Sequence, residues 1–211
     1  MSDKRKEVVR QGYDVVSQAY RADDGSGMPS NYAGWLAELT PLLPPGAPVL
    51  ELGCGCGLPV AKRLADDFAY TGVDLSPVQI ERAQALVPNG RFLTADMTTL
   101  DYQPGSFAAV LAFYAIIHLP LDEQRPLLAN IFRWLQPGGC LMATVGHTAW
   151  TGTRENWLGA PMFWSHADAA TYRQWLTEIG FSLHWDRFIP EGDSGHTLLL
   201  AQKPLTSKES P

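Results

Sequence analysis

The chain of 211 residues has the size of one domain with an embellishment and is too short for two independent catalytic domains. Hydrophobic residues make up 45% of it and charged residues 18%, so it can bury a sizeable core and is not intrinsically disordered over most of its length. The formal net charge is −6, and no run of Lys and Arg extends beyond residues 4–6, which disfavours a nucleic-acid partner.

The cysteines and the N-terminal residues indicate the cellular compartment in which we expect the protein. Three cysteines, with Cys54 and Cys56 between glycines, suit neither a disulfide framework nor a zinc site, and we expect no metal. The N-terminal residues lack the apolar region that export requires, and no apolar run reaches the roughly 20 residues that span a bilayer. We therefore expect a cytoplasmic protein without a membrane partner; the sequence leaves its oligomeric state open.

The first part of the chain is predicted to be helical. Apolar residues at helical spacing predict a helix over 4–20, and the Asp-, Gly- and Ser-rich segment 22–30 predicts a mobile loop. A second helix is expected over 32–43, where Pro44-Pro45-Gly46 stops it.

From residue 45 onward, short apolar segments alternate with helical ones. Strands are expected at 48–52, 70–74, 91–95, 107–113 and 140–145, and helices at 58–68, 78–86 and 122–135. This alternation predicts an α/β fold with a parallel sheet and helices on both faces.

The last third of the chain departs from that alternation. An irregular stretch is expected over 146–166, followed by a helix over 167–179 and strands at 181–188 and 197–202. Because only residues 189–196 join the last two strands, we expect them to pair as an antiparallel hairpin.

A glycine-rich segment, Glu51-Leu52-Gly53-Cys54-Gly55-Cys56-Gly57, follows the first strand. Small residues between a strand and a helix let a ligand approach the backbone closely, although a tight turn alone is the alternative. Asp74 ends the second strand, where a carboxylate can accept hydrogen bonds from both hydroxyls of a ribose or can cap the next helix. Because Leu58 and Val60 stand where a dinucleotide motif requires Gly or Ala, the spacing favours a different nucleotide-like ligand.

Four ordered motifs resemble those of class I S-adenosylmethionine-dependent methyltransferases. They are the glycine-rich segment at 51–57, Gly-Val-Asp-Leu-Ser at 72–76, Thr-Ala-Asp-Met at 94–97 and Leu-Gln-Pro-Gly-Gly at 135–139. The resemblance covers about residues 48–146. It implies S-adenosylmethionine as cofactor, S-adenosylhomocysteine as product, and a doubly wound, mostly parallel seven-stranded sheet with a reversed final strand. On this basis we expect an N-terminal helical lid at 1–44, a core at 45–204 with a lid insertion at 147–166, and a tail at 205–211.

The resemblance also implies which residues bind the cofactor. Gly53 and Gly55 would face its methionine portion, and Asp74 its ribose hydroxyls. Glu51 would hold the loop or the sulfonium side through hydrogen bonds, with an ordinary strand-end carboxylate as the alternative. Tyr13 and Tyr20 resemble aromatic residues of a lid helix, with packing as the alternative. The other residues implied to contact the adenine or to close the cofactor cleft are Leu75, Asp96, Met97, Phe113 and Tyr114.

The sequence says less about the methyl acceptor than about the cofactor. The sulfonium is already activated, so the protein needs mainly to align a nucleophile and exclude water. A general base would assist a hydroxyl or ammonium acceptor, and His118 and His147, just past expected strands, are the candidates.

Three tryptophans recur every seven residues at Trp150, Trp157 and Trp164 without a helical pattern. We interpret this segment as an aromatic lid suited to a small apolar or aromatic acceptor or a cation, with a satellite hydrophobic cluster as the alternative. We assign Tyr114, Trp157, Trp164 and His166 to acceptor binding.

Motifs for methylating nucleic-acid bases are absent, which leaves an oxygen, nitrogen or sulfur nucleophile of a small molecule. The alternatives are a nucleotide-dependent oxidoreductase and a catalytically silent binding module of the same fold.

Overall fold

The computed structural model describes residues 3–27 and 31–205. Residues 28–30 of the expected mobile loop and residues 206–211 of the expected tail therefore lie outside the described residues. The described part of that loop forms a turn that is closed by a β-bridge between Arg21 and Gly27. Within the described ranges, no helix is long and apolar enough to cross a membrane.

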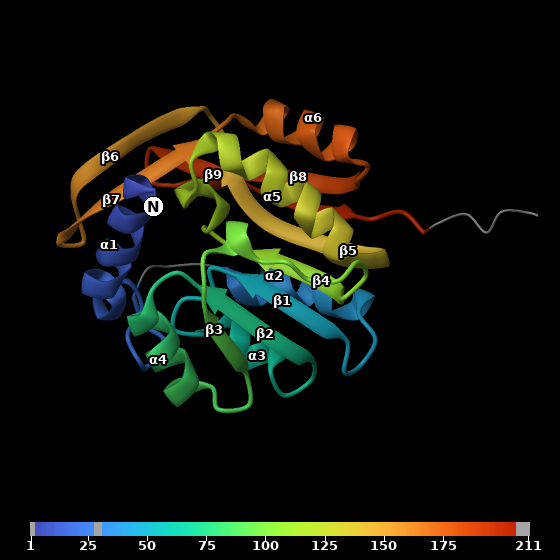
Figure 1. Ribbon diagram of the computed structural model, residues 1–211, viewed down its shortest axis with the longest axis horizontal. Coiled ribbons are helices and arrows are strands. Elements are labelled where there is room, and N and C mark those ends of the chain that lie inside the picture. The colour runs from blue at the N-terminus through green and yellow to red at the C-terminus, as the bar shows by residue number, and fades with distance from the viewer. Residues whose placement is uncertain (1–2, 28–30, 206–211) are drawn as a thin grey trace, which may run out of the picture.

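A seven-stranded sheet in the order β3-β2-β1-β4-β5-β9-β8 forms the centre of the molecule (Figure 1). Its strands are β1 (Pro48–Leu52), β2 (Ala69–Asp74), β3 (Arg91–Thr94), β4 (Phe107–Ala112), β5 (Leu135–Gly146), β8 (Ser182–Glu191) and β9 (Ser194–Gln202). β1 to β5 pair in parallel, whereas β9 is antiparallel to both β5 and β8. The predicted α/β sheet with its reversed final strand and terminal hairpin is confirmed.

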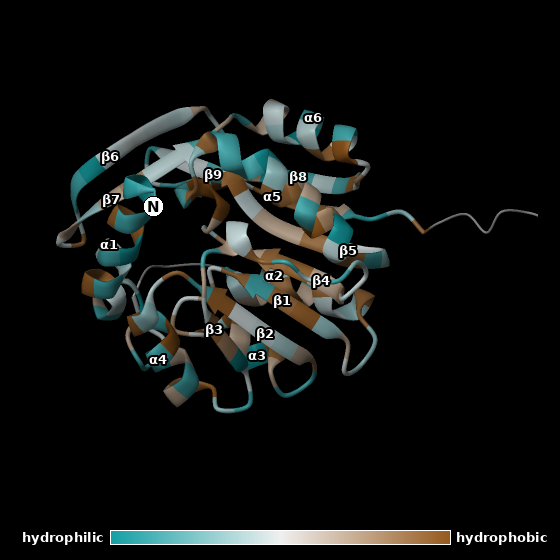
Figure 2. Cartoon of the chain, viewed as in Figure 1, coloured by the Kyte–Doolittle hydropathy of each residue, from teal (hydrophilic) through white to brown (hydrophobic). Residues whose placement is uncertain are grey.

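Helices cover both faces of the sheet and bury two separate cores. Their bounds are α1 (Lys4–Tyr20), α2 (Tyr32–Leu39), α3 (Val60–Leu64), α4 (Pro77–Leu86), α5 (Leu121–Trp134) and α6 (Ala169–Ile179). α2, α3 and α4 bury apolar side chains on one face, and α5 and α6 on the other. All six residues of β4 are buried between them, which explains its continuous apolar sequence (Figure 2).

Local signals begin and end several of these helices. The Ser76 side chain accepts a hydrogen bond from the backbone N–H of Gln79 and thereby caps α4, which has Pro77 in its first turn. Asp168 caps α6 in the same way, and Gly180, with φ of +111°, ends it. The expected helix over 58–68 is shorter, and the one over 32–43 gives way to a 3₁₀ turn at Thr40–Leu42.

The segment that we expected to be irregular is instead a β-hairpin, so that expectation is wrong. β6 (Trp150–Trp157) pairs antiparallel with β7 (Ala160–His166) through a turn in which Leu158 and Gly159 both have positive φ. Gly152 leaves room for the Trp150 ring on the same face of β6, because a Cβ there would lie 2.9 Å from the Cζ2 of Trp150.

α1 packs against this hairpin and not on the main sheet (Figure 1). Val9 and Val16 of α1 form a third hydrophobic cluster with Ala160, Met162 and Phe163 of β7. The helix approaches so closely that a Cβ on Gly12 would lie 2.7 Å from the Met162 Cε and from the Pro161 carbonyl oxygen. α1 and the hairpin thus form one layer beside the sheet.

Candidate functional site

The glycine loop after β1 presents bare backbone to a cavity. Gly53, Gly55 and Gly57 have φ of +75°, +54° and +80°, a region that L-residues with side chains disfavour. The backbone N–H groups of Gly53 and Cys54 both donate to the carbonyl of Val73 on β2. A Cβ on Gly53 would also come closer than 3.0 Å to the Ala115 Cβ. Glycine is thus required at 53 on both conformational and steric grounds.

Asp74 ends β2 at the edge of the same cavity. One of its carboxylate oxygens accepts a hydrogen bond from the Gly55 N–H at 2.9 Å, and the other accepts from the Ser76 N–H at 2.9 Å. Burial raises the pKa of Asp74 to about 6, which the backbone hydrogen bonds oppose. Each carboxylate oxygen can accept a second hydrogen bond, so Asp74 can still accept hydrogen bonds from the hydroxyl groups of a ligand.

Glu51 lies beneath the loop and does not line the cavity. It accepts a hydrogen bond from the Tyr70 hydroxyl, and burial raises its pKa to about 8. Its position is that of a loop support.

The first cavity encloses about 660 Å³, its open mouth included, within the range of small-molecule sites. It lies where β1 and β4 are neighbours and the strand order reverses, the usual ligand position in doubly wound sheets. Every residue that we assigned to the cofactor except Glu51 lines it: Tyr20, Gly53, Gly55, Asp74, Leu75, Asp96, Met97 and Phe113.

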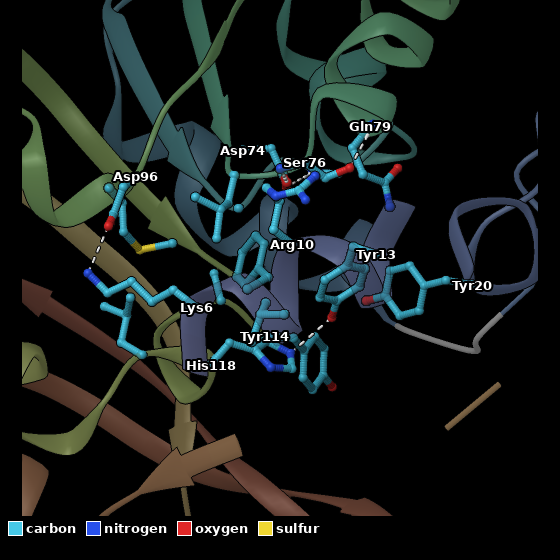
Figure 3. A pocket seen from close by; sticks show the side chains of 18 residues that line it. Lys6, Arg10, Tyr13, Tyr20, Asp74, Ser76, Gln79, Asp96, Tyr114 and His118 are labelled. Atoms are coloured by element: carbon cyan, nitrogen blue, oxygen red, sulfur yellow. Dashed lines mark hydrogen bonds and ion pairs between the residues drawn. The ribbon is translucent and has the colours of Figure 1, made fainter. Parts of the chain in front are cut away.

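A lysine from α1 reaches into this cavity (Figure 3). The ammonium of Lys6 lies 2.7 Å from a carboxylate oxygen of Asp96 and forms a second ion pair with Glu123 of α5. Burial acts to raise the pKa of Asp96, but hydrogen bonds from Lys6 and Thr98 outweigh it and hold that pKa below its usual value. Asp96 is therefore an anion that fastens α1 to the end of β3.

A larger second cavity adjoins the first. It encloses about 1770 Å³ with its open mouth and is lined by the four residues that we assigned to the acceptor: Tyr114, Trp157, Trp164 and His166. The two cavities share four lining residues: Tyr13, Tyr20, Tyr114 and His118. A ligand in one cavity would thus meet a ligand in the other among three phenols and an imidazole.

Tyr114 holds its place at this junction in a strained conformation. Its φ is +53°, a region that costs a residue with a side chain of the order of 1–3 kcal/mol. The side-chain hydroxyl of Thr144 on β5 accepts a hydrogen bond from its backbone N–H, which helps to hold that conformation. Strain of this kind concentrates at functional sites.

His118 has a defined tautomer. Its Nδ1 lies 2.7 Å from the Phe163 carbonyl oxygen, which can only accept, so Nδ1 carries the proton. Its Nε2, 2.9 Å from the Tyr13 hydroxyl, therefore accepts the Tyr13 proton (Figure 3). Burial lowers the pKa of His118 to about 4, so the imidazole is neutral at pH 7.

His147 lies outside the lining of both cavities. Its side chain is exposed, lies 3.0 Å from the Thr197 hydroxyl and packs on the Phe188 ring. His118 is thus the histidine of the two candidate bases that faces both ligand spaces.

The sequence analysis assigned no role to three lining residues, Lys6, Glu191 and His196. Lys6 lies seven residues before Tyr13 and fourteen before Tyr20, and this spacing, which places all three on one face of α1, could have indicated it. Glu191 and His196 enter the second cavity from the β8–β9 hairpin, where nothing in the local sequence marks them. Only the pairing of β9 with β5 brings them there.

A glycine loop after β1, an acid at the end of β2 and another after β3, around the reversal of strand order, define the class of doubly wound proteins that bind S-adenosylmethionine. Among the residues that the structure describes, no group of three or more His, Cys, Asp or Glu side chains could hold a metal ion.

The comparisons with known proteins agree with this class. Residues 49–139 match a family model described as "Methyltransferase domain". The 2-methyl-6-phytyl-1,4-hydroquinone methyltransferase of Synechocystis sp. is 35% identical over 105 residues, 47% of this chain and 32% of that protein. Phosphoethanolamine N-methyltransferase 1 of Arabidopsis thaliana is 36% identical over 149 residues, 67% of this chain and 26% of that protein. The chain thus spans a third or less of the length of these two relatives.

A solved structure shows the same fold over nearly the whole chain. Magnesium protoporphyrin IX methyltransferase from Synechocystis, with bound S-adenosylhomocysteine, aligns with a TM-score of 0.72 and 18% identity, covering 95% of this chain and 100% of that one. Residues 49–139 of the chain are thus a methyltransferase domain of the S-adenosylmethionine-dependent class I type.

Proposed function

We propose that the chain binds S-adenosylmethionine in the first cavity and transfers its methyl group to an oxygen, nitrogen or sulfur nucleophile of a small molecule held in the second. The observation that carries this proposal is the pair of cavities that meet at Tyr13, Tyr20, Tyr114 and His118. One cavity has the family motifs in its lining, and the other is walled by aromatic side chains.

The residues of the first cavity fit the parts of the cofactor. Asp74 has hydrogen-bonding capacity left for ribose hydroxyls, and Leu75 and Met97 offer apolar surface for an adenine ring. Asp96 would accept from the adenine amino group, and the bare backbone of the glycine loop would admit the methionine portion. Glu51 would act through the loop that it supports.

We assign a lid role to residues 1–44 and to the insertion 147–166. α1 is fastened to the start of α4, just after β2, because Ser76 donates to Asp14 at 2.6 Å and Ser17 donates to Gln79 at 2.9 Å. The contact of Lys6 with Asp96 fastens it to the end of β3. A helix held across both cofactor loops would exclude water from the junction, which methyl transfer requires.

When bound, S-adenosylmethionine supplies a methyl group that is already electrophilic. The chain would align the acceptor and take its proton. Because the Tyr13 hydroxyl donates to His118 Nε2, its oxygen is free to accept a proton from the acceptor while its own proton passes to Nε2. His118 is neutral before this transfer and an imidazolium after it, with Nδ1–H donating to the Phe163 carbonyl throughout.

Calorimetric titration with S-adenosylmethionine, S-adenosylhomocysteine and, as control, NADH tests the cofactor. We expect the first two to bind and NADH not to bind. Asp74→Asn keeps the shape of the side chain but removes its charge, so it should weaken binding by about 1–3 kcal/mol. Tight binding of NADH alone would instead indicate an oxidoreductase.

Release of S-adenosylhomocysteine in the presence of small hydroxyl, amine and thiol acceptors tests the transfer. Cofactor binding with no release from any acceptor class would contradict methyl transfer and indicate a binding module.

A further inference from the structure

The inner face of the β6–β7 hairpin is a continuous aromatic surface. Trp150, Trp157 and Trp164 all line the second cavity, with ring centroids 5.5 Å apart for Trp157 and Trp164 and 6.3 Å apart for Trp150 and Trp164. Gly152 lies between them without a side chain, so the Trp150 ring extends across the strand. Such a surface suits the flat body of a ring compound.

One charged residue lies on this surface. Arg154 shares the strand face of Trp150 and Gly152, because alternate residues of a strand point to the same side. Its guanidinium carbon lies 5.9 Å from the Trp150 ring centroid and 5.6 Å from that of Trp164. Within residues 3–27 and 31–205, the side chain of Arg154 makes no ion pair and no hydrogen bond. The planar fork of five N–H donors, which matches carboxylate and phosphate groups, is thus available in the cavity.

The carboxylate of the same cavity is already engaged. Among the described lining residues Glu191 is the single acid, and it lies 3.1 Å from Nδ1 of His196. Burial acts to raise the pKa of Glu191, but hydrogen bonds from His196 and from the Tyr114 hydroxyl lower it on balance. Glu191 is therefore a satisfied anion, whereas none of the described carboxylates forms an ion pair with Arg154.

We propose that the methyl acceptor is an anion, namely a planar ring compound whose carboxylate or phosphate binds Arg154 while its nucleophile lies at the Tyr13–His118 pair. The position of the nucleophile rests on the proposed function; the anion site does not. Trp164 lies between the two ends, 5.6 Å from the guanidinium carbon and 5.3 Å from the His118 ring centroid. An acceptor one or two fused rings long therefore reaches both ends.

Calorimetry with four probes of one ring shape tests the charge preference: 2-naphthoate, 2-naphthyl phosphate, 2-naphthamide and 2-naphthylmethylammonium. We expect one or both anions to bind about tenfold or more tightly than the amide, because a bidentate charged contact is worth at least that factor. The preference should shrink at high salt. A preference for the carboxylate or for the phosphate identifies which anion the acceptor carries.

Variants assign the preference to one side chain. Arg154→Gln should remove the difference between anion and amide, and Arg154→Lys should restore part of it, since Lys keeps the charge but not the fork. Arg125→Gln is the matched control, because Arg125 is also exposed but pairs with Glu178 outside the cavity. Thermal unfolding of each variant checks that the fold is kept.

Three results would overturn the proposal: no binding of either anion, tightest binding of the ammonium probe, or an anion affinity that Arg154→Gln leaves unchanged. A separate titration with S-adenosylmethionine keeps the two hypotheses apart. If the cofactor fails to bind while Arg154 still governs anion binding, the methyltransferase proposal fails and the anion site stands.

Discussion

Replacing Gly53 by alanine puts a methyl group where the loop has neither the conformation nor the space for it. The φ of +75° costs an L-residue roughly 1–2 kcal/mol. The added Cβ also comes closer than 3.0 Å to the Cβ of Ala115, and overpacking of this kind costs about 1–3 kcal/mol. We therefore expect Gly53→Ala to lower the free energy of unfolding by about 2–5 kcal/mol. Because relief of the contact must move the glycine loop or Ala115, both of which line the first cavity, cofactor binding should be lost as well.

Gly105→Ala is the matched control for the steric part. Gly105 has almost the same φ, +72°, but a Cβ there would have no atom within 4 Å. We expect it to cost only the backbone component, roughly 1–2 kcal/mol, with cofactor affinity unchanged. Urea unfolding and calorimetry with S-adenosylhomocysteine measure the two effects. Equal destabilisation by the two substitutions, or full affinity in Gly53→Ala, would refute the reasoning.

Three further substitutions test the loop support, the lid and the proton path. Burial raises the pKa of Glu51 to about 8, so between pH 7 and 8 the folded chain keeps a proton that the unfolded chain has lost, and the free energy of unfolding should fall by about 1 kcal/mol over that interval. This interval lies above the pKa values of Asp74 and His118. In Glu51→Gln, the free energy of unfolding, measured with urea, should change less between pH 7 and 8 than in the parent. An equally small change in the parent would contradict the assignment. Lys6→Met removes the ammonium that joins α1 to Asp96 and Glu123. Amide hydrogen exchange over residues 4–20 should therefore accelerate, while exchange in β4 stays slow. Unchanged protection of the α1 amides would exclude the role of Lys6 in holding the helix. Tyr13→Phe removes the donor to His118 and should slow single-turnover methyl transfer by about 10²-fold without changing cofactor affinity, whereas Tyr102→Phe, outside both cavities, should leave the rate unchanged.

The lining of the first cavity was predictable because the signals for it are local in the sequence. Glycines at 53 and 55 are needed by backbone conformation at those positions, and Asp74 ends the strand that its own apolar sequence defines. The order of the sheet around them follows from short βα connections, which allow few arrangements of consecutive parallel strands. The spacing of the sequence motifs was therefore enough to predict the residues that line the first cavity.

The lining of the second cavity was decided by contacts between distant segments. Trp150 and Trp164 were recognised as a cavity wall, but the strand pairing that puts them on one face with Arg154 was missed, because Gly152 and Pro161 are unfavourable for strands by propensity. The pairing places Gly152 opposite Trp164, and the Trp150 ring lies over Gly152.

The sequence by itself determined the α/β class, the glycine loop and its acidic partners, since each depends on residues a few positions apart or on strands that follow one another. The tertiary structure alone decided that His118, and not His147, faces both cavities. The Phe163 carbonyl and the Tyr13 hydroxyl, 45 and 105 residues away in the chain, set its tautomer and hydrogen bond. Long-range packing places such partners, and no local pattern in the sequence encodes them.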